Sequence, residues 1–351
     1  MKQFLNIFLA VCLLALNACS NPADRRICFF GSSVCRGVGA DSLHGYAWQY
    51  SKLLPKSWSI VNLSVDGNDT YDLLARFDTD LLPDDSRFVV IGLSLGNEGL
   101  HESGEAAVLS YKENLQTLAR KIRELGRIPV VAGSYVRADF NPVDYEDLLS
   151  VNLEMMQWDL PTIAFLGALD DGCGRWADCC WNHEDKWHPN TYGHTLLCSA
   201  IPPSLFQALA QGKPLPYRSK ALNRLKSDGL NGSASFIPEA GLHSYTLSYK
   251  CADTVYTKVH SSARNLTWYY VNGECQTETD DNLVPASFTI EGNALCDLFF
   301  FRTPLSPREV KALADGAMLR SSLEIYAPLT GDSPAENLAQ TLNTITINPY
   351  Y

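Results

Sequence analysis

Two serines directly after an apolar run are the first residues in the chain whose types and spacing could do chemistry. The run at 27–30 ends at Gly31, and Ser32 and Ser33 follow at once. A strand that stops here places a small hydroxyl group on a tight strand-to-helix turn at the rim of a sheet, where it could act as a nucleophile. Alternatively, both serines only cap a helix. The motif alone leaves both interpretations open.

An aspartate and a histidine far downstream could complete the chemistry of such a serine. Asp185 lies three residues before His188, which is followed by Pro189 and Asn190. At this spacing the carboxylate can bond one ring nitrogen and leave the other free to accept a serine proton. In the alternative interpretation Asp185 caps a helix and His188 is a turn residue facing solvent. Two nearby histidines, His183 and His194, compete for the same role.

The elements that must position these residues alternate along the first two thirds of the chain. Apolar runs predict strands at 26–30, 58–63, 88–93, 128–133 and 162–166. Amphipathic helices lie between them, most clearly at 104–125, and a last helix is expected from Pro189 to Ala210. Strands separated by helices indicate a parallel sheet covered on both faces, so the predicted fold class is α/β, a three-layer α/β/α sandwich.

Polar turns follow the first three predicted strands. They are Gly31-Ser32-Ser33, Asp66-Gly67-Asn68 and Gly96-Asn97-Glu98. Because the carboxyl ends of parallel strands meet at one edge of a sheet, we expect the three turns to converge. Glu98 is as readily a solvated residue as a functional one.

These turns and the downstream pair together resemble the four sequence blocks of the SGNH (GDSL-like) hydrolase family. Gly31-Ser32-Ser33, Gly67, Asn97 and Asp185-x-x-His188 occur in the family's order, and the resemblance covers residues 24–210. It implies a flavodoxin-like sheet and ester hydrolysis that requires no metal or organic cofactor.

By the same resemblance Ser33 would be the nucleophile, His188 the general base and Asp185 the carboxylate that orients it. The backbone N–H groups of Ser33 and Gly67 and the side-chain amide of Asn97 would form the oxyanion hole. Two departures from the family pattern matter. Ser32 stands where the family usually has Asp, and the glycine before Asn97 is adjacent to it instead of two residues earlier.

The last third of the chain has a different character. A Pro/Gly-containing, basic stretch at 211–235 predicts a linker. Beyond it, at 236–351, short aromatic segments predict strands at 244–249, 266–271, 287–290, 298–302 and 323–327, with a hairpin turn at Asn272-Gly273 and a helix at 306–315 that begins after Ser306. We therefore expect a smaller β-sandwich domain. Residues 266–320 resemble concanavalin-like (laminin-G-like) jelly rolls, which implies either sugar binding or packing against a neighbouring domain.

The N-terminus predicts export. Lys2 precedes an apolar run at 4–16 that is too short to span a bilayer, and Leu16-Asn17-Ala18-Cys19 resembles a bacterial lipobox. Residues 1–19 are therefore expected to form a lipoprotein signal peptide with Cys19 as the lipidated mature N-terminus, so that the protein is anchored to a membrane at the periplasmic or cell-surface side without spanning it. Ordinary signal cleavage, giving a free exported protein, is the alternative.

The net charge bears on whether the protein binds nucleic acid, and the cysteines bear on disulfide bonds and metal binding. The formal net charge of −11 argues against nucleic acid, because phosphates would be repelled. Nine of the 11 cysteines follow Cys19, and their pairing cannot be deduced from the sequence. The set Cys173, Cys179, Cys180 and His183 matches no familiar zinc framework, so no metal is expected.

The predicted function is a carbohydrate O-acetylesterase, an exported serine esterase acting on an acylated, most readily acetylated, glycan. Three tryptophans near the histidine, Trp176, Trp181 and Trp187, form either a wall on which sugars stack or part of the core. Alternatives are a lipase, thioesterase or arylesterase of the same fold, an acyltransferase that uses a second sugar, or a non-catalytic glycan-binding lipoprotein.

Overall fold

The computed structural model describes residues 22–218, 229–281, 283–331 and 333–350. The expected signal peptide at 1–19, including Cys19, lies outside the described residues. Across the described ranges, no helix combines the length and the apolar character needed to cross a bilayer.

Five parallel strands form the centre of the first domain. They are β1 (Arg26–Gly31), β2 (Ser59–Asn62), β3 (Phe88–Gly92), β4 (Ile128–Ala132) and β5 (Thr162–Ile163). Their order in the sheet is β2-β1-β3-β4-β5, the flavodoxin-like order with its switch point between β1 and β3. The predicted α/β fold class is confirmed.

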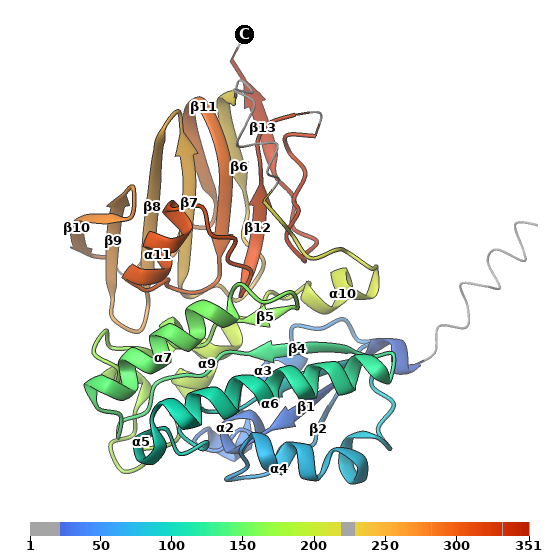
Figure 1. Cartoon of the computed structure of the whole chain (residues 1–351). Coiled ribbons are helices and arrows are strands. Elements are labelled where there is room, and N and C mark those ends of the chain that lie inside the picture. Colours follow the sequence, from blue (N-terminus) through green and yellow to red (C-terminus); the bar gives the residue numbers. More distant parts are fainter. Residues whose placement is uncertain (1–21, 219–228, 282, 332, 351) are drawn as a thin grey trace, which may run out of the picture.

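Helices cover both faces of this sheet (Figure 1). One face carries α4 (Thr70–Ala75), α6 (Glu105–Glu124) and α7 (Pro142–Met155), and the other carries α3 (Tyr46–Ser51), α9 (Thr191–Ser199) and α10 (Leu205–Ala210). The short helices are α2 (Ser33–Arg36), α5 (Leu100–Ser103), α8 (Leu166–Leu169), and the single-turn elements η1 (Pro22–Arg25), η2 (Asp41–Leu43), η3 (Phe77–Leu81) and η4 (Asp178–Cys180).

Two expected elements differ from the structure. The single helix expected up to Ala210 is two helices, because Pro202 and Pro203 interrupt it between α9 and α10; a proline lacks the N–H that a continuing helix needs. The fifth strand is shorter than expected, and Leu166 begins α8 instead of ending β5.

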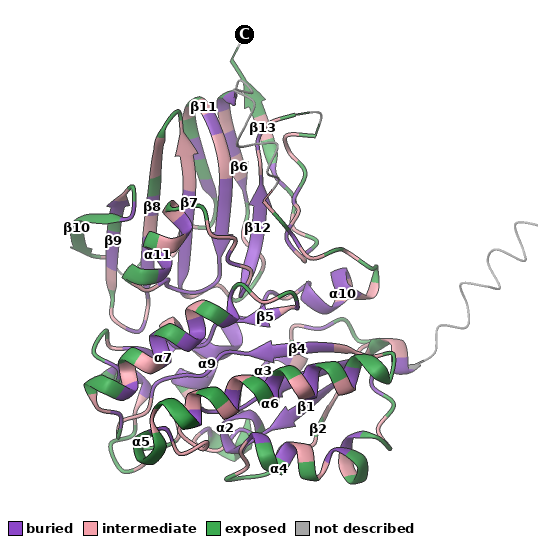
Figure 2. Cartoon of the chain, viewed as in Figure 1, coloured by how far each residue is buried: buried purple, intermediate pink, exposed green. Residues whose placement is uncertain are grey.

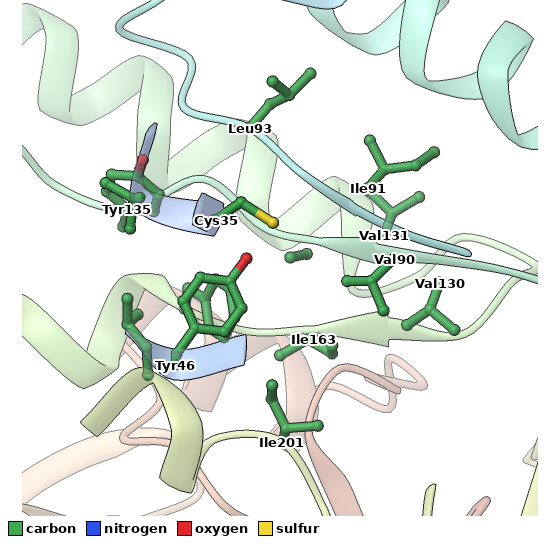
Figure 3. Packing of buried hydrophobic residues seen from close by; sticks show 14 of the residues in the cluster. Cys35, Tyr46, Val90, Ile91, Leu93, Val130, Val131, Tyr135, Ile163 and Ile201 are labelled. Atoms are coloured by element: carbon green, nitrogen blue, oxygen red, sulfur yellow. The ribbon is translucent and has the colours of Figure 1, made fainter. Parts of the chain in front are cut away.

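The core of this domain lies on both sides of the sheet. Every residue of β3 is buried, as the continuous apolar run of a central parallel strand requires. Figure 3 shows branched side chains of β3 and β4, such as Val90 and Val131, packed beside Cys35 of α2 and Tyr46 of α3. Figure 2 shows that α6 is buried on one side and exposed on the other, which accounts for its amphipathic pattern, whereas α10 is buried over most of its surface.

The second domain is an antiparallel β-sheet domain, consistent with the predicted β-sandwich. Its strands are β6 (Leu230–Phe236), β7 (Tyr245–Cys251), β8 (Thr254–Ser261), β9 (Leu266–Val271), β10 (Glu274–Asp280), β11 (Phe288–Phe301), β12 (Leu323–Ala327) and β13 (Thr346–Pro349). The order is β10-β9-β8-β7-β11-β6-β13, and β12 also pairs with β11. Each of two buried clusters draws on residues of this sheet. Strand β6 begins within the stretch expected to be linker.

One long strand replaces two predicted ones. The segments expected as strands at 287–290 and 298–302 both belong to β11, which first pairs with β6 and then with β7 and β12. Register shifts between Gly292 and Leu295 and between Cys296 and Phe299, with left-handed backbone at Ala294 and Asp297, show that bulges bend the strand without ending it. Helix α11 (Pro307–Ala314) begins after Ser306, as predicted.

Hydrogen bonds and apolar contacts both join the two domains, and Met156 and Ala164 of the first domain belong to a buried apolar cluster of the second. Backbone and side chains at Ser321 and Ser322 pair along the outer edge of β5: the Ser322 N–H donates to the Thr162 carbonyl at 3.2 Å, and the Ala164 N–H donates to the Ser322 hydroxyl at 2.9 Å. This edge strand is therefore covered by the second domain, not by solvent. Nearby, the fully buried Arg302 donates to the carbonyl of Ser199 at the end of α9 at 2.7 Å.

Candidate active site

Ser33 lies at the first residue of α2, directly after β1. The Ser32 N–H continues the β1–β3 pairing by donating to the Gly92 carbonyl at 3.1 Å, and the chain then turns into the helix. Gly31 is required at this crossing, because a Cβ there would lie 2.0 Å from the Gly92 carbonyl oxygen. The turn thus presents the Ser33 side chain at the carboxyl edge of the sheet, as the sequence predicted.

His188 and Asp185 meet Ser33 from a segment more than 150 residues away. The Ser33 hydroxyl lies 2.8 Å from the Nε2 atom of His188, and the Nδ1 atom of His188 lies 2.6 Å from an Asp185 carboxylate oxygen. The other Asp185 oxygen accepts the Trp187 N–H at 2.8 Å and the His188 N–H at 3.2 Å. Partial burial acts to raise the pKa of Asp185, but hydrogen bonds from the Trp187 N–H and the His188 ring prevail and hold it below its usual value.

The three expected oxyanion donors surround the same cleft. Ser33, Gly67 and Asn97 all line it, and Gly67 adopts the left-handed backbone (φ 77°) that favours glycine. Within the described part of the chain, the N–H groups of Ser33 and Gly67 have no hydrogen-bond acceptor. The Asn97 amide donates one hydrogen to the Asn68 carbonyl at 3.0 Å, which orients the side chain and leaves its second hydrogen available.

Arg76 supports this group of donors, and the sequence analysis did not identify it. Its guanidinium donates to the carbonyl of Leu63 (2.8 Å), which directly follows β2, and to the carbonyl of Gly31 (3.3 Å), the last residue of β1. It also donates to the Asn68 side chain (2.6 Å). It also lies over the Phe30 ring, 4.2 Å from the centroid. Arg76 therefore fixes the turns that carry Ser33 and Gly67 relative to each other. The sequence shows only its i,i+4 spacing to Asp80, with which it pairs at 2.9 Å; the two carbonyls that give Arg76 this role belong to segments distant in the chain.

Glu98 links the Asn97 turn to the Gly67 turn. Its carboxylate accepts the N–H and the hydroxyl of Thr70, at 3.0 and 2.5 Å, at the start of α4. Burial raises the pKa of Glu98 despite these two bonds. The sequence left Glu98 open between a solvated and a functional residue; the structure gives it a half-buried position that holds the Asn97 turn in place.

The rim of the cleft carries an arginine and a tryptophan. The cleft has a volume of about 280 Å³ and is also lined by Val38, Tyr135, Arg137 and Trp187. Arg137 makes a bidentate pair with Asp139 at 2.6 and 3.0 Å, and its guanidinium lies over Gly96. The Trp187 indole N–H donates to the same Asp139 carboxylate at 3.2 Å, so the ring is oriented although it is 57% exposed.

The other two histidines near this block occupy different environments. His194 is buried; its Nε2 lies 2.9 Å from the Val38 carbonyl oxygen and its Nδ1 accepts the Tyr46 N–H at 3.2 Å. Burial lowers the pKa of His194 to about 4, so that it stays neutral and supports α3. His183 is exposed and pairs with Asp178 at 3.3 Å. Neither residue is among those that line the cleft.

The remaining candidates fall into supporting positions. Trp176 is buried against Tyr135, and the Trp181 indole N–H donates to the Asp185 carbonyl at 2.7 Å. Only Trp187 of the three tryptophans faces the cleft. Over the described ranges no cluster of three or more His, Cys, Asp or Glu side chains is arranged to hold a metal ion, and Cys179 and Cys180 have sulfur atoms 3.7 Å apart.

This arrangement can perform acyl transfer. A carboxylate on Nδ1 fixes the tautomer of His188, and Nε2 faces the Ser33 hydroxyl. Residues that line the same cleft carry N–H donors without an acceptor among the described residues. Ser32, which replaces the usual aspartate of the family, is fully buried and its hydroxyl has no partner among the described residues. It therefore contributes no charge to the site.

The family comparison agrees with this geometry. Residues 29–196 match the model of the GDSL-like Lipase/Acylhydrolase family. This range runs from β1 to α9 and contains all the residues that the SGNH resemblance assigned to the site. The first domain is a GDSL-like (SGNH) hydrolase domain, and the protein is a carboxylic ester hydrolase. The match does not extend into the second domain, whose concanavalin-like character remains a prediction.

Solved structures similar to the chain cover the same part of it. A lipolytic protein of the G-D-S-L family from Desulfitobacterium hafniense is 16% identical, with 50% of this chain and 95% of that chain covered and a TM-score of 0.42. The acetylxylan esterase Axe2 from Geobacillus stearothermophilus is 18% identical (50% and 90% covered, TM-score 0.40), and TesA is 20% identical (49% and 93% covered, TM-score 0.41). No curated protein matches the chain.

Proposed function

We propose that the protein is a carbohydrate O-acetylesterase in which Ser33 is the nucleophile, His188 the general base and Asp185 the carboxylate that orients it. Ser33 attacks the acyl carbonyl while His188 takes its proton and returns it to the departing sugar hydroxyl. Water then repeats the sequence and releases the acid. The N–H groups of Ser33 and Gly67 and the Asn97 amide stabilise the oxyanion.

The polar rim of the cleft is the main observation that favours a carbohydrate ester as the substrate. Beside the Ser33–His188 pair stand the Asn97 amide, the Arg137–Asp139 ion pair and the Trp187 indole. A long acyl chain needs an extended apolar wall, and among the described residues that line the cleft only Val38, Tyr135 and Trp187 offer apolar surface. A short acyl group on a polar alcohol fits this lining.

Trp187 gives the alcohol part of the substrate a surface to rest on. Its ring is exposed next to His188 and is held by the bond to Asp139, so little side-chain freedom is lost when a ligand covers it. The C–H face of a sugar ring is apolar while its hydroxyl groups need partners, and an oriented indole beside an arginine and a carboxylate supplies both.

Acetate release from a panel of acetylated glycans tests this function. We expect release by the native chain and loss of release and of fluorophosphonate labelling in Ser33→Ala. Ser110→Ala, whose hydroxyl bonds only to carbonyls within α6, serves as the matched control and should retain both. Activity retained in Ser33→Ala would refute the nucleophile assignment.

The acyl-chain preference separates the carbohydrate esterase from the alternatives. With 4-nitrophenyl esters we expect hydrolysis to fall steeply from acetate to longer acyl chains. A rise in hydrolysis with acyl-chain length would indicate a lipase or thioesterase. A protein that neither reacts with the fluorophosphonate nor hydrolyses any of the esters would support the non-catalytic, glycan-binding alternative.

The proposed location is the periplasm or the cell surface of a bacterium, with the protein anchored to a membrane by a lipid on Cys19. The support is the sequence alone: Lys2, the apolar run at 4–16 and the small residue before Cys19. In an expressing bacterium the native protein should sediment with membranes, and Cys19→Ala should release it or leave it unprocessed. A soluble native protein would indicate ordinary signal cleavage.

A further inference from the structure

A second cavity lies between the two domains, apart from the catalytic cleft. It has a volume of about 170 Å³. The first domain contributes Tyr145 at the start of α7 and the turn after α8 at Asp170 and Gly172; the second contributes residues of β8, β9 and the segment before α11. None of the residues that line it lines the cleft. We call it the interdomain pocket.

Arg264 is the cation of the interdomain pocket, and no acidic side chain in the described part of the chain pairs with it. It lies in the turn between β8 and β9, with its guanidinium 4.2 Å from the centroid of the Trp268 ring. The other domain closes over it at Gly172, where a side chain would come within 2.7 Å of a guanidinium nitrogen. Within the described ranges only the backbone N–H of Arg264 makes a hydrogen bond, to the Ser261 hydroxyl; the guanidinium makes no hydrogen bond and no ion pair, although it is only partly exposed. Its donors are thus held in one place and left unused.

The acid in the same pocket does not use these donors. Asp170 is buried; one of its oxygens accepts the Tyr145 hydroxyl at 2.5 Å, and the other accepts the N–H groups of Gly172 and Gly174 at 2.9 and 3.2 Å. Burial raises the pKa of Asp170 in spite of these bonds. Three donors therefore satisfy the carboxylate of Asp170, and it does not take up the donors of Arg264.

The other walls suit a ring-shaped ligand. Trp268 and Tyr270 contribute aromatic surface, and Leu166, Val259 and Leu305 contribute aliphatic surface. At roughly 30 Å³ for each water, the volume corresponds to about six water molecules, the bulk of a single sugar ring. A guanidinium binds a carboxylate through two parallel hydrogen bonds, with a geometry that a neutral hydroxyl group does not match. We propose that the interdomain pocket binds the carboxylate-bearing ring of a uronic acid in a glycan chain.

One segment connects the interdomain pocket to the catalytic cleft. Asp170 pairs with Trp176 in an isolated β-bridge, and the Trp176 ring stacks on Tyr135, which lines the cleft, with 5.8 Å between centroids. The same segment continues to Trp187 and His188. A glycan held at its uronic acid in the pocket would thus meet the segment that presents the catalytic histidine. This inference rests on the proposed function for the identity of the substrate, but the binding step does not require catalysis.

Calorimetric titration of the full chain tests the pocket. Ser33→Ala is used as the background so that no ligand is turned over. The probes are methyl β-glucuronide, methyl β-glucoside and sodium acetate, which separate the carboxylate from the ring. We expect the glucuronide to bind at least about tenfold more tightly than the other two. Arg264→Gln should weaken glucuronide binding by roughly tenfold to a hundredfold, the value of a charge-assisted hydrogen bond or pair of bonds.

Two further variants guard the interpretation. Arg264→Lys keeps the charge but loses the two-pronged geometry, so its affinity should fall between those of the parent and Arg264→Gln. Arg308→Gln changes a neighbouring arginine that pairs with Glu146 and does not line the pocket, and it should bind as the parent does. Three results would each overturn the proposal. They are equal affinities for the glucuronide and the glucoside, equal affinities for the glucuronide and acetate, and an unchanged affinity for the glucuronide in a folded Arg264→Gln protein. Arg264-dependent glucuronide binding by a protein that releases acetate from no glycan would uphold the pocket and refute the esterase.

Discussion

Two clusters of charged side chains in this molecule use similar groups in opposite ways. At the carboxyl edge of the parallel sheet, Asp185 and His188 are partly exposed, with side-chain exposures of 30% and 15%. Beside them lie N–H donors for which no described residue provides an acceptor. At the interface of the domains, Arg302 and Glu324 are both fully buried and 2.6 Å apart. The first cluster is incomplete without a ligand, and the second is complete.

In the interface cluster, Arg302 and Glu324, the two charged side chains are surrounded by hydrogen-bond partners. Arg302 donates to the carbonyls of Ser199, Glu239 and Ala240, at 2.7, 3.0 and 2.9 Å, in addition to Glu324. Glu324 in turn accepts the Glu239 N–H at 2.8 Å and a hydrogen of the Asn343 amide. A buried charge is tolerated only with such partners, whereas an active site keeps donors free for the charge that develops in the transition state.

The largest effect should come from removing the carboxylate of the incomplete cluster. Asp185→Asn should lower kcat by about 10⁴-fold, because the amide favours the wrong tautomer of His188, and should change the free energy of unfolding little. Steady-state hydrolysis of 4-nitrophenyl acetate measures the change. Asp178→Asn is the control, since Asp178 pairs with the exposed His183 on the same segment away from the cleft. If both variants lost the same fraction of kcat, the Asp185–His188 pair would have no more effect on catalysis than the exposed Asp178–His183 pair.

Removing the cation of the complete cluster should instead act on stability. Arg302→Met leaves Glu324 buried without its charge partner and frees three carbonyl acceptors, so the free energy of unfolding should fall by about 3–5 kcal/mol. Urea unfolding followed by fluorescence measures it, with Arg308→Met as the exposed counterpart, expected within about 0.5 kcal/mol of the native chain. An Arg302→Met protein as stable as the native one would mean that the cluster is dispensable.

Loss of the Asn97 amide should lower activity much more than stability, although it also removes the bond to the Asn68 carbonyl. Asn97→Ala should reduce kcat by about 10²–10³-fold with little change in KM, because in the proposed mechanism the amide stabilises the oxyanion and does not bind the ground-state ester. The adjacent Gly96 departs from the family pattern, so the size of this loss also measures how well Asn97 is placed. A loss below about threefold would exclude Asn97 from the oxyanion hole.

A buried acid without a cation should make stability depend on pH. Glu309 bonds to the Ser306 N–H at 2.7 Å, and burial raises its pKa from 4.5 to about 7. The folded chain therefore holds this proton more tightly than the unfolded chain. The stabilisation is complete below pH 4.5 and is lost as the pH rises through 7, about 3 kcal/mol in all.

Glu309→Gln retains the capping box and removes the titration, so its melting temperature should fall less than that of the native chain between pH 5 and 8. Parallel melting curves of the two proteins across this range would show that Glu309 does not titrate there.

The sequence predicted the parts of the molecule that depend on local pattern. Apolar runs such as 88–93 were enough to place the strands. The turns at Ser33, Gly67 and Asn97 were then enough to predict which residues meet at the carboxyl edge of the sheet, because a parallel sheet brings strand ends together wherever they lie in the chain. The break at Pro202-Pro203 was visible in the sequence and was missed.

What the sequence could not supply depends on contacts between distant segments. Arg302 bonds mainly to backbone carbonyls of other elements, and Arg76 bonds to two of them, and no sequence pattern shows which carbonyl a side chain will reach. Strand β11 looked like two strands because its bulged middle has the composition of a turn. The interdomain pocket likewise arises only when Gly172 and Arg264, from different domains, face each other.

The way Ser321 and Ser322 cover β5 has a consequence for anyone who wishes to work with the hydrolase domain alone. A chain cut after α10 would expose an open row of peptide groups along β5, and such a row readily recruits a strand from another molecule. We expect that fragment to self-associate, so the catalytic half of this protein should be handled together with the half that protects it.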